Sequence, residues 1–205
     1  ELLKDPRVDP SDDNNEAIIQ ASENGHLEVV KELLKDSRVD PSDEDNRAIR
    51  LASENGHLEV VKELLKDHRV DPSDGINRAI TRASERGHLE VVKELLKDPR
   101  VDPSDEDNRA IRWASRYGHF EVVKELLKDS RVDPSADNNY AIRWASRYGH
   151  FEVVKELEVV KLLMKDPRVD PSADNNYAIR WASENGHLEV VKELLKDPRV
   201  DPSDN

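Results

Sequence analysis

The chain has 205 residues, of which 38% are charged and 36% hydrophobic, and its formal net charge is −13 at pH 7. This acidic balance argues against nonspecific binding to DNA or to anionic membranes, because both attract basic surfaces. The absence of cysteine excludes disulfides and thiolate metal sites. No apolar run approaches the ~18 residues of a membrane span and no signal peptide is recognisable, so we expect a soluble, cytoplasmic protein.

One segment of the sequence recurs six times. The string Gly-His-Leu-Glu-Val-Val-Lys-Glu-Leu-Leu-Lys-Asp starts at Gly25 and returns, nearly unchanged, at Gly56, Gly87, Gly118, Gly149 and Gly186. The step is 31 residues up to Gly149 and 37 residues for the last copy. Self-similarity with a period of about 20–50 residues is typical of a solenoid, in which units stack because none can bury its apolar face alone.

Each unit is expected to hold two short helices and a turn. In the first complete unit a helix is predicted at residues 16–24, with Asn15 as its N-cap because the side chain can accept a hydrogen bond from the first turn. Gly25 ends this helix as a left-handed residue. A second helix is predicted at residues 26–35, where apolar residues recur at helical spacing, and a turn containing proline follows at 36–42. Helices this short need packing between units.

This unit, with its segment Ala-Ser-x-x-Gly-His-Leu-Glu-Val-Val-Lys, resembles the ankyrin repeat over essentially the whole chain. The resemblance implies an all-α, helix-turn-helix repeat solenoid that acts as a non-enzymatic scaffold for protein interactions. The unit departs from the family's common pattern in its length, which is 31 residues rather than about 33, and in its Arg-Val-Asp-Pro-Ser turn. We therefore expect loops that are shorter than the family's finger-like hairpins or bent differently.

The repeats predict a single ankyrin-type domain over residues 1–205. Residues 1–11 are the end of a truncated repeat, and the following units are 12–42, 43–73, 74–104, 105–135, 136–172 and 173–203. A solenoid normally ends in repeats with a polar outer face, and neither end of the chain shows one. We expect an excerpt from a longer array, and the sequence leaves open whether that array is natural or designed.

The unit at 136–172 contains a near-duplication of six residues, which lies between Glu152 and Leu163. Six extra residues rotate a helix by 600°, so the apolar stripe loses its phase. We expect a second helix that is either bulged or longer by about 9 Å, with a local defect in stacking. A slippage scar, an engineered probe and an added contact surface all remain open as explanations.

Histidine follows the helix-ending glycine in every unit, at positions 26, 57, 88, 119, 150 and 187. These histidines are too far apart to share a tetrahedral metal, whose ligands lie about 2 Å away, and we expect them to make structural hydrogen bonds at helix starts. The acidic turns, such as residues 42–46, lack the spacing of a calcium loop. Because no catalytic constellation or phosphate loop stands out, we expect no metal, no cofactor and no enzymatic activity.

The units differ most on the exposed face of the first helix. The central units carry arginine there, which makes a basic ridge on an acidic protein, and tyrosine and tryptophan cluster in the same region. Arg112 and Arg116, like Arg143 and Arg147, are like charges four residues apart, which cost a helix about 0.2–0.5 kcal/mol per pair and suggest a purpose other than stability. The predicted partner-binding residues are Arg109, Arg112, Arg116, Tyr117, Tyr140, Arg143, Arg147, Tyr148, Tyr177 and Arg180.

Two interpretations of this ridge stay open. Acidic turn residues such as Asp105, Glu106 and Asp107 could neutralise it, or it could bind an acidic protein or peptide. The tryptophans favour a ladder between repeats, whereas tyrosine and arginine are enriched at binding hot spots. The leading prediction is a monomeric scaffold that binds a protein or peptide through the ridge and the loop tips. The alternatives are a structural or engineered array with no selected partner, and polyanion binding through the arginines, which the net charge disfavours.

Overall fold

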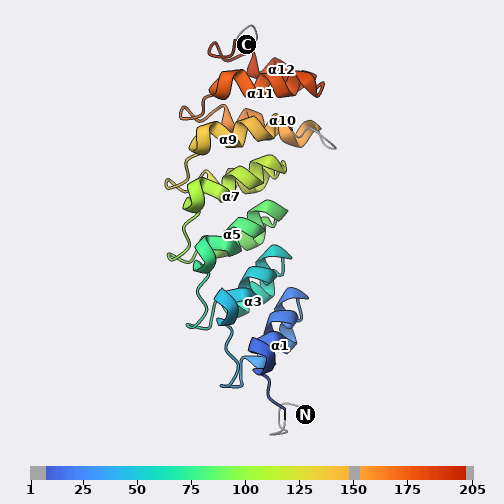
Figure 1. Cartoon of the computed structure of the whole chain (residues 1–205), viewed down its shortest axis with the longest axis vertical. Coiled ribbons are helices and arrows are strands. Elements are labelled where there is room, and N and C mark those ends of the chain that lie inside the picture. The colour runs from blue at the N-terminus through green and yellow to red at the C-terminus, as the bar shows by residue number, and fades with distance from the viewer. Residues whose placement is uncertain (1–7, 148–152, 202–205) are drawn as a thin grey trace. The chain divides into compact units, whose positions relative to one another are not determined.

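The computed structural model describes residues 8–147 and 153–201, in which it places twelve α-helices and no strand (Figure 1). The first helix of each repeat is called helix A here and the second helix B. The A helices are α1 (Asp12–Glu23), α3 (Asp43–Glu54), α5 (Asp74–Arg86), α7 (Asp105–Arg116), α9 (Ala136–Ala145) and α11 (Ala173–Glu184). The B helices are α2 (Leu27–Leu33), α4 (Leu58–Leu64), α6 (Leu89–Leu95), α8 (Phe120–Leu126), α10 (Val153–Leu163) and α12 (Leu188–Leu194).

The chain consists of two compact units, Glu1–Asp102 with α1–α6 and Pro103–Asn205 with α7–α12. Within each unit every helix A packs against its own helix B. Like helices of successive repeats pack side by side, which gives one layer of A helices and one of B helices (Figure 1). This is the all-α repeat solenoid that the sequence predicts. The single domain and its repeat boundaries remain predictions.

Equivalent positions form the core of successive repeats. In the second repeat, Ala48, Ile49 and Ala52 of α3 are fully buried, together with Val61 and Leu64 of α4. The alanines let neighbouring helices approach closely, and the larger side chains fill the space between the two layers. Removing a Val, Leu or Ile side chain from water contributes roughly 1.5–3 kcal/mol, which explains how helices of only 7 residues persist.

A left-handed turn lies within the first residues of each helix A. In α1, Asp13, Asn14 and Asn15 have φ between 57° and 60°, and the other five repeats have an equivalent left-handed triplet. The predicted N-cap role of Asn15 is wrong, because its side chain is buried against the next repeat. Its Oδ1 accepts a hydrogen bond from the backbone N–H of Asp40 at 2.7 Å, and its Nδ2 donates to Asp43 at 2.9 Å. This asparagine therefore connects successive repeats.

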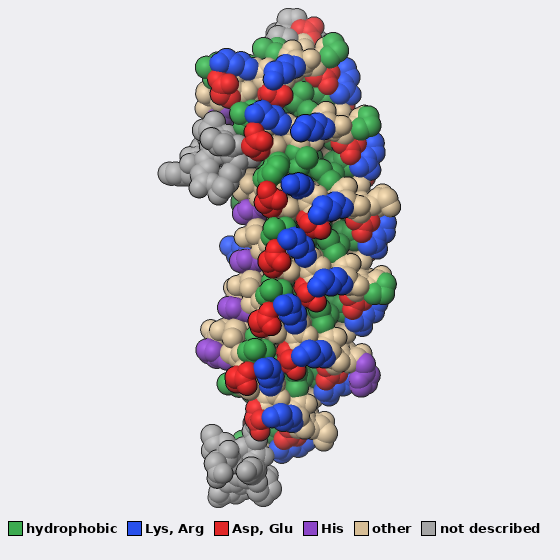
Figure 2. Space-filling model, turned by 180° about the vertical axis from the view of Figure 1, so that it is seen from behind, with side chains coloured by type: hydrophobic (Ala, Val, Ile, Leu, Met, Phe, Trp, Pro, Cys, Tyr) green, Lys and Arg blue, Asp and Glu red, His purple; other side chains and the backbone are tan. Residues whose placement is uncertain are grey.

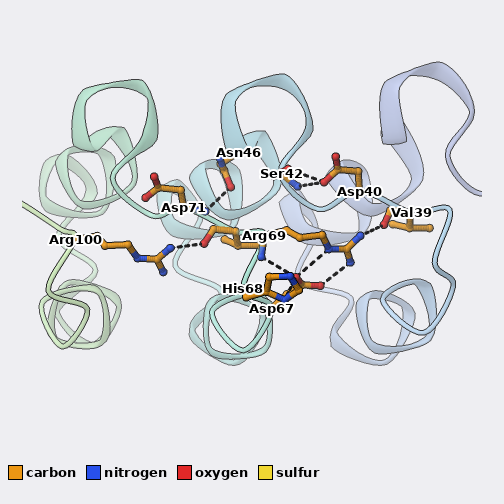
Figure 3. A network of polar contacts seen from close by, with 10 residues as sticks. Val39, Asp40, Ser42, Asn46, Asp67, His68, Arg69, Asp71 and Arg100 are labelled. Carbon is orange, nitrogen blue, oxygen red and sulfur yellow. Dashed lines mark hydrogen bonds and ion pairs between the residues drawn. The ribbon is translucent and has the colours of Figure 1, made fainter.

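An arginine in the turn after helix B makes a second connection (Figure 3). Arg69 donates from Nε and Nη2 to the carboxylate of Asp67, at 3.0 and 2.6 Å, and from Nη1 to the carbonyl of Val39 in the preceding repeat, at 2.7 Å. These hydrogen bonds hold the pKa of Asp67 below its usual range. The equivalent bonds from Arg38 lower the pKa of Asp36 to about 2. The Arg69 side chain thus fixes its own turn and joins it to the backbone of the preceding repeat.

The outer surface of helix B carries pairs of opposite charge. Lys31 lies 2.7 Å from Glu28, and Lys35 lies 2.6 Å from Glu32, both three residues apart along the chain. On the face seen in Figure 2, basic and acidic side chains lie beside one another in both units. Exposed pairs of this kind contribute only about 0.2–0.5 kcal/mol each. They favour solubility and offer no large field of one sign.

Candidate functional site

The described candidate residues lie on α7, α9 and α11 of the second unit and in the turns beside them. Arg112 of α7 reaches the turn of the following repeat, where it forms an ion pair with Asp137. Its guanidinium carbon also lies 4.9 Å from the centre of the Tyr140 ring. Only 17% of the Arg112 side chain is exposed. This arginine therefore points along the face toward the next repeat, and a carboxylate and an aromatic ring both hold it there.

Arg143 of α9 has the same surroundings one repeat later. It pairs with Asp174 at 3.3 Å, and its guanidinium carbon lies 4.8 Å from the centre of the Tyr177 ring. Its Nη1 also donates to the carbonyl of Asn138 at 3.1 Å. The side chain is 15% exposed. Each of these two arginines therefore has an acidic partner inside the protein, although the buried Nε of each has no hydrogen-bond partner in the described part of the chain.

Arg116 and Arg147 form a second row, in which they lie between tryptophan rings. The guanidinium carbon of Arg116 is 4.8 Å from the ring centre of Trp113 and 4.6 Å from that of Trp144. Arg147 lies 4.7 Å from Trp144 and 4.0 Å from Trp181. Each such cation–π contact contributes about 0.5–1 kcal/mol when exposed and about 2 when desolvated. These contacts outweigh the repulsion of about 0.2–0.5 kcal/mol between arginines four residues apart.

Acidic turn residues neutralise part of the ridge. Arg109 pairs with Glu106, one of the turn residues that the sequence singled out. Arg112 and Arg143 pair instead with Asp137 and Asp174, which belong to the turns that follow. The tryptophans form the predicted ladder within this unit, and the ladder includes the arginines between the rings.

Tyr117 and Arg180 are the other described candidates. Tyr117 stacks on Trp113 with ring centres 5.8 Å apart and is 48% exposed, more than any other aromatic residue among those described. Arg180 of α11 is exposed and donates from Nη1 to the carbonyl of Asn175 at 3.3 Å. Tyr148 lies outside the described residues. Tyr117 therefore combines an exposed aromatic surface with a fixed ring orientation.

The surroundings of this face fit a peptide better than a small ligand or a metal. A shallow hollow of about 430 Å³ is lined by Glu106, Asp107, Arg109, Arg112 and Trp113. Its walls are mostly charged, whereas small-molecule sites are mostly apolar. Within residues 8–147 and 153–201, no three His, Cys, Asp or Glu side chains are placed to hold a metal ion. Over the same residues no helix has the length and apolar character to cross a membrane.

The repeat pattern matches a known family. A family model described as ankyrin repeats in three copies matches residues 1–76 and 80–157, and one described as ankyrin repeat matches residues 174–205. The chain belongs to the ankyrin repeat family. Ankyrin repeats are generally scaffolds for protein–protein interactions, and the family is typically non-enzymatic.

Two solved ankyrin structures are similar to this chain. One is EF0377, an ankyrin repeat protein with 27% sequence identity and a TM-score of 0.71, in a comparison that covers 88% of this chain and 96% of that one. The other is the human ASB11 ankyrin repeat domain, with 17% identity, a TM-score of 0.70, and coverage of 87% and 82%. At 17% identity the likeness shows the fold alone. No curated protein matches this sequence.

Two histidines of the first unit connect neighbouring ankyrin repeats. Nε2 of His57 lies 2.9 Å from the carbonyl oxygen of Glu23, and Nε2 of His88 lies 2.9 Å from that of Glu54. Both carbonyls are near the end of the preceding helix A, where backbone oxygens lack partners within the helix. The predicted hydrogen-bonding role of these histidines is confirmed, but the predicted position of the bonds, at the start of the histidine's own helix, is wrong. The bonds lie between repeats, and His57 makes no side-chain cap to its own helix α4.

The six-residue insertion lengthens one ankyrin helix B, as predicted. Helix α10 has 11 described residues, against 7 in α8. Its second Glu-Val-Val-Lys segment takes the core positions, since Val159, Val160 and Leu163 are fully buried. The predicted stacking defect is visible beside it. Helix α9 has 10 residues where α7 has 12, and the buried Nε2 of His187 has no hydrogen-bond partner in the described part of the chain.

Two features of this ankyrin array were not predicted from the sequence. Asp137 and Asp174 were not predicted as partners of the ridge, although an acid recurs in the turn after each of these arginines. A hollow of about 320 Å³ on the B helices, lined partly by Phe120, Leu162 and Met164, was also missed. The sequence feature that could have indicated this hollow is Leu162, which stands where the other units have glutamate.

Proposed function

We propose that this ankyrin chain binds an acidic protein or peptide through the helix A face of its second unit, with Trp113, Arg116 and Tyr117 at the centre of the contact. The other predicted partner-binding residues would surround this centre. The protein itself would be monomeric, cytoplasmic and without enzymatic activity. It builds on the general role of the family as a protein-interaction scaffold.

The observation that carries the proposal is the exposed Tyr117 beside a fixed arginine. Tyr117 stacks on Trp113, and Arg116 lies between Trp113 and Trp144. Side chains held in one orientation lose little conformational entropy on binding, so more of the contact energy becomes affinity. Tryptophan, tyrosine and arginine are also the residues that dominate binding hot spots.

The more deeply seated arginines have a supporting role in this proposal. Arg112 and Arg143 are mostly covered and already paired with Asp137 and Asp174. A partner would gain little from them directly, because their carboxylate sites are taken. They keep the tyrosine rings of the next repeat in place, and so they shape the surface that a partner meets.

The test uses substitutions that other repeats already contain, so that they are expected to leave the fold unchanged. Tyr117 and Arg116 stand where the second repeat has Asn55 and Glu54, so Tyr117→Asn and Arg116→Glu install residues that the fold already accepts. Peptides are selected from a random display library on the parent chain and then titrated against both variants. The expected loss is about 30-fold or more for each, as for a hot-spot residue of about 2 kcal/mol. The control is Phe120→Leu on helix B, which also restores a repeat residue and should leave the affinity unchanged.

Two outcomes would contradict the proposal. Selected peptides that bind both variants as well as the parent would move the binding surface elsewhere. A selection that yields no peptide specific for the parent would favour a structural array. Tight binding of single-stranded DNA, with an affinity that falls steeply as salt rises, would support the polyanion alternative because each neutralised phosphate releases counterions.

A further inference from the structure

The first unit contains an arginine whose partners are missing. In the second unit, Arg112 is held by Asp137 and Tyr140 from the next turn. Arg50 of α3 occupies the equivalent position in the first unit, and the next turn has Gly75 and Arg78 where that aspartate and tyrosine stand. Arg50 thus meets a turn that offers neither a carboxylate nor an aromatic ring from those two positions.

The geometry keeps Arg50 beside this turn. A Cβ placed on Gly75 would lie 3.6 Å from Nη1 of Arg50 and 3.3 Å from Cδ of Arg78. The two arginines therefore flank the position from which a carboxylate would reach out. No ion pair joins either of them to another residue within the described part of the chain. Arg50 is half-buried, whereas Arg78 is exposed.

The neighbouring acids do not take the place of the missing carboxylate. Asp74 accepts a hydrogen bond from the Gly75 N–H at 2.6 Å and another from Nδ2 of Asn46 at 2.8 Å, so both its oxygens are engaged. Burial and then the charge of Arg78 lower the pKa of Arg50, with a smaller contribution from Arg47, and these effects exceed the opposing effects of Asp45 and Asp74. Burial of Arg50 without an ion-paired carboxylate consequently disfavours its charged form.

The turn itself departs from the rest of the array. The other five turns carry an acid at the position of Gly75, namely Asp13, Glu44, Glu106, Asp137 and Asp174. The next residue, Ile76, is 50% exposed and has a φ of 64°, which is unfavourable for a β-branched side chain. This turn therefore combines two arginines that form no ion pair within the described part of the chain with an exposed apolar side chain at a strained position.

We propose that Arg50 and Arg78 bind the carboxylate of an aspartate or glutamate from a partner protein, in the space beside Gly75, with Ile76 contacting an apolar neighbour of that acid. The partner supplies the group that Asp137 supplies to Arg112 within the protein. A planar guanidinium binds a carboxylate through two hydrogen bonds. This site is in the first unit, and it does not depend on the face proposed for the second.

The experiment follows the side-chain Nε–H signals of Arg50 and Arg78 by NMR in the full chain, with assignments from Arg50→Lys and Arg78→Lys. The probe is the peptide acetyl-Ile-Asp-Leu-amide, and acetyl-Ile-Asn-Leu-amide is its uncharged control. Only the aspartate peptide is expected to shift both signals. In Gly75→Asp, which the fold accepts because the other turns carry acids there, binding should weaken roughly tenfold or more.

A gain-of-function variant completes the test. Asp137→Gly removes the internal carboxylate from Arg112, and the aspartate peptide is then expected to shift the Nε–H signal of Arg112, which it leaves unchanged in the parent. The proposal would be overturned if the two peptides acted alike, or if Gly75→Asp bound the aspartate peptide as well as the parent does. Shifts with inorganic phosphate and none with the aspartate peptide would also overturn it, in favour of a phosphate site.

Discussion

The contact between Gly56 and His88 provides a quantitative test of how the repeats fit together. Gly56 ends a helix A with a φ of +77°, and a Cβ added to it would lie 2.6 Å from Nδ1 and 2.7 Å from Cε1 of the His88 ring. That ring has little freedom to move, because its Nε2 is 2.9 Å from the carbonyl oxygen of Glu54. Alanine at this position would therefore collide with the next repeat.

Two costs are expected for Gly56→Ala. The left-handed backbone costs about 1 kcal/mol for a residue with a Cβ. The collision adds about 1–3 kcal/mol of overpacking, including any loss of the histidine hydrogen bond. Gly186→Ala is the matched control, because Gly186 has nearly the same φ of +75° and nothing within 4 Å of an added Cβ. We expect a loss of about 2–4 kcal/mol for Gly56→Ala and about 1 kcal/mol for the control.

The assay is urea unfolding followed by circular dichroism, with the double variant Gly56→Ala/His88→Ala included. Removing the ring should relieve the collision, so in the His88→Ala background the glycine substitution should cost only about 1 kcal/mol. Equal losses for Gly56→Ala and Gly186→Ala, together with no coupling to His88, would refute the close fit and leave only the backbone cost.

Three further substitutions test separate parts of the fold. Ser53→Ala removes a buried hydroxyl that has no hydrogen-bond partner in the described part of the chain, and it should stabilise the protein by about 1 kcal/mol. Ser146→Ala should not stabilise it, because the Ser146 hydroxyl donates a hydrogen bond to a carbonyl at 2.8 Å. The midpoints of urea unfolding measure both effects. Ile76→Asn relieves a β-branched residue at a φ of 64° and should raise the melting temperature, corresponding to about 1 kcal/mol, and an unchanged value would speak against backbone strain there. Arg69→Gln removes the group that lowers the pKa of Asp67. Because a lowered carboxyl pKa stabilises the fold above the ordinary value of about 4 and this stabilisation is lost as pH falls, the variant should be less stable than the parent at pH 7, and the difference should shrink toward pH 2.

Most of the fold could be predicted from the sequence because its determinants are local. The helices follow from apolar spacing, and the glycine after each helix A has the positive φ expected of it at every described position. The error at Asn15 has a physical reason. An asparagine before a helix is typical of an N-cap when the helix is considered alone, but the partners of Asn15 are Asp40, in the turn that ends the unit, and Asp43, in the next unit.

The candidate site was harder to predict for a related reason. A helical wheel indicates that Arg112 and Arg143 face outward from their own helices. It contains no information on the rotation between repeats, and that rotation brings Asp137 and Tyr140 against Arg112. A helical wheel therefore could not show that several of these predicted residues are already paired within the protein.

Near-identity of the repeats makes their differences informative about function. The contacts that link successive repeats recur, since Asn46 repeats the bond of Asn15 to the next turn and Arg100 repeats that of Arg69 to the preceding repeat. A substitution that departs from the repeat and costs stability is therefore hard to explain by folding alone. Gly75 and Ile76 depart in this way, because Gly75 removes a carboxylate from beside Arg50 and Ile76 places a β-branched residue at a positive φ. Tyr117 departs too, because it exposes an aromatic ring. Binding of a partner would explain both departures from the repeat. Because the two sites lie in different units, each can be tested by substitutions that leave the other unchanged.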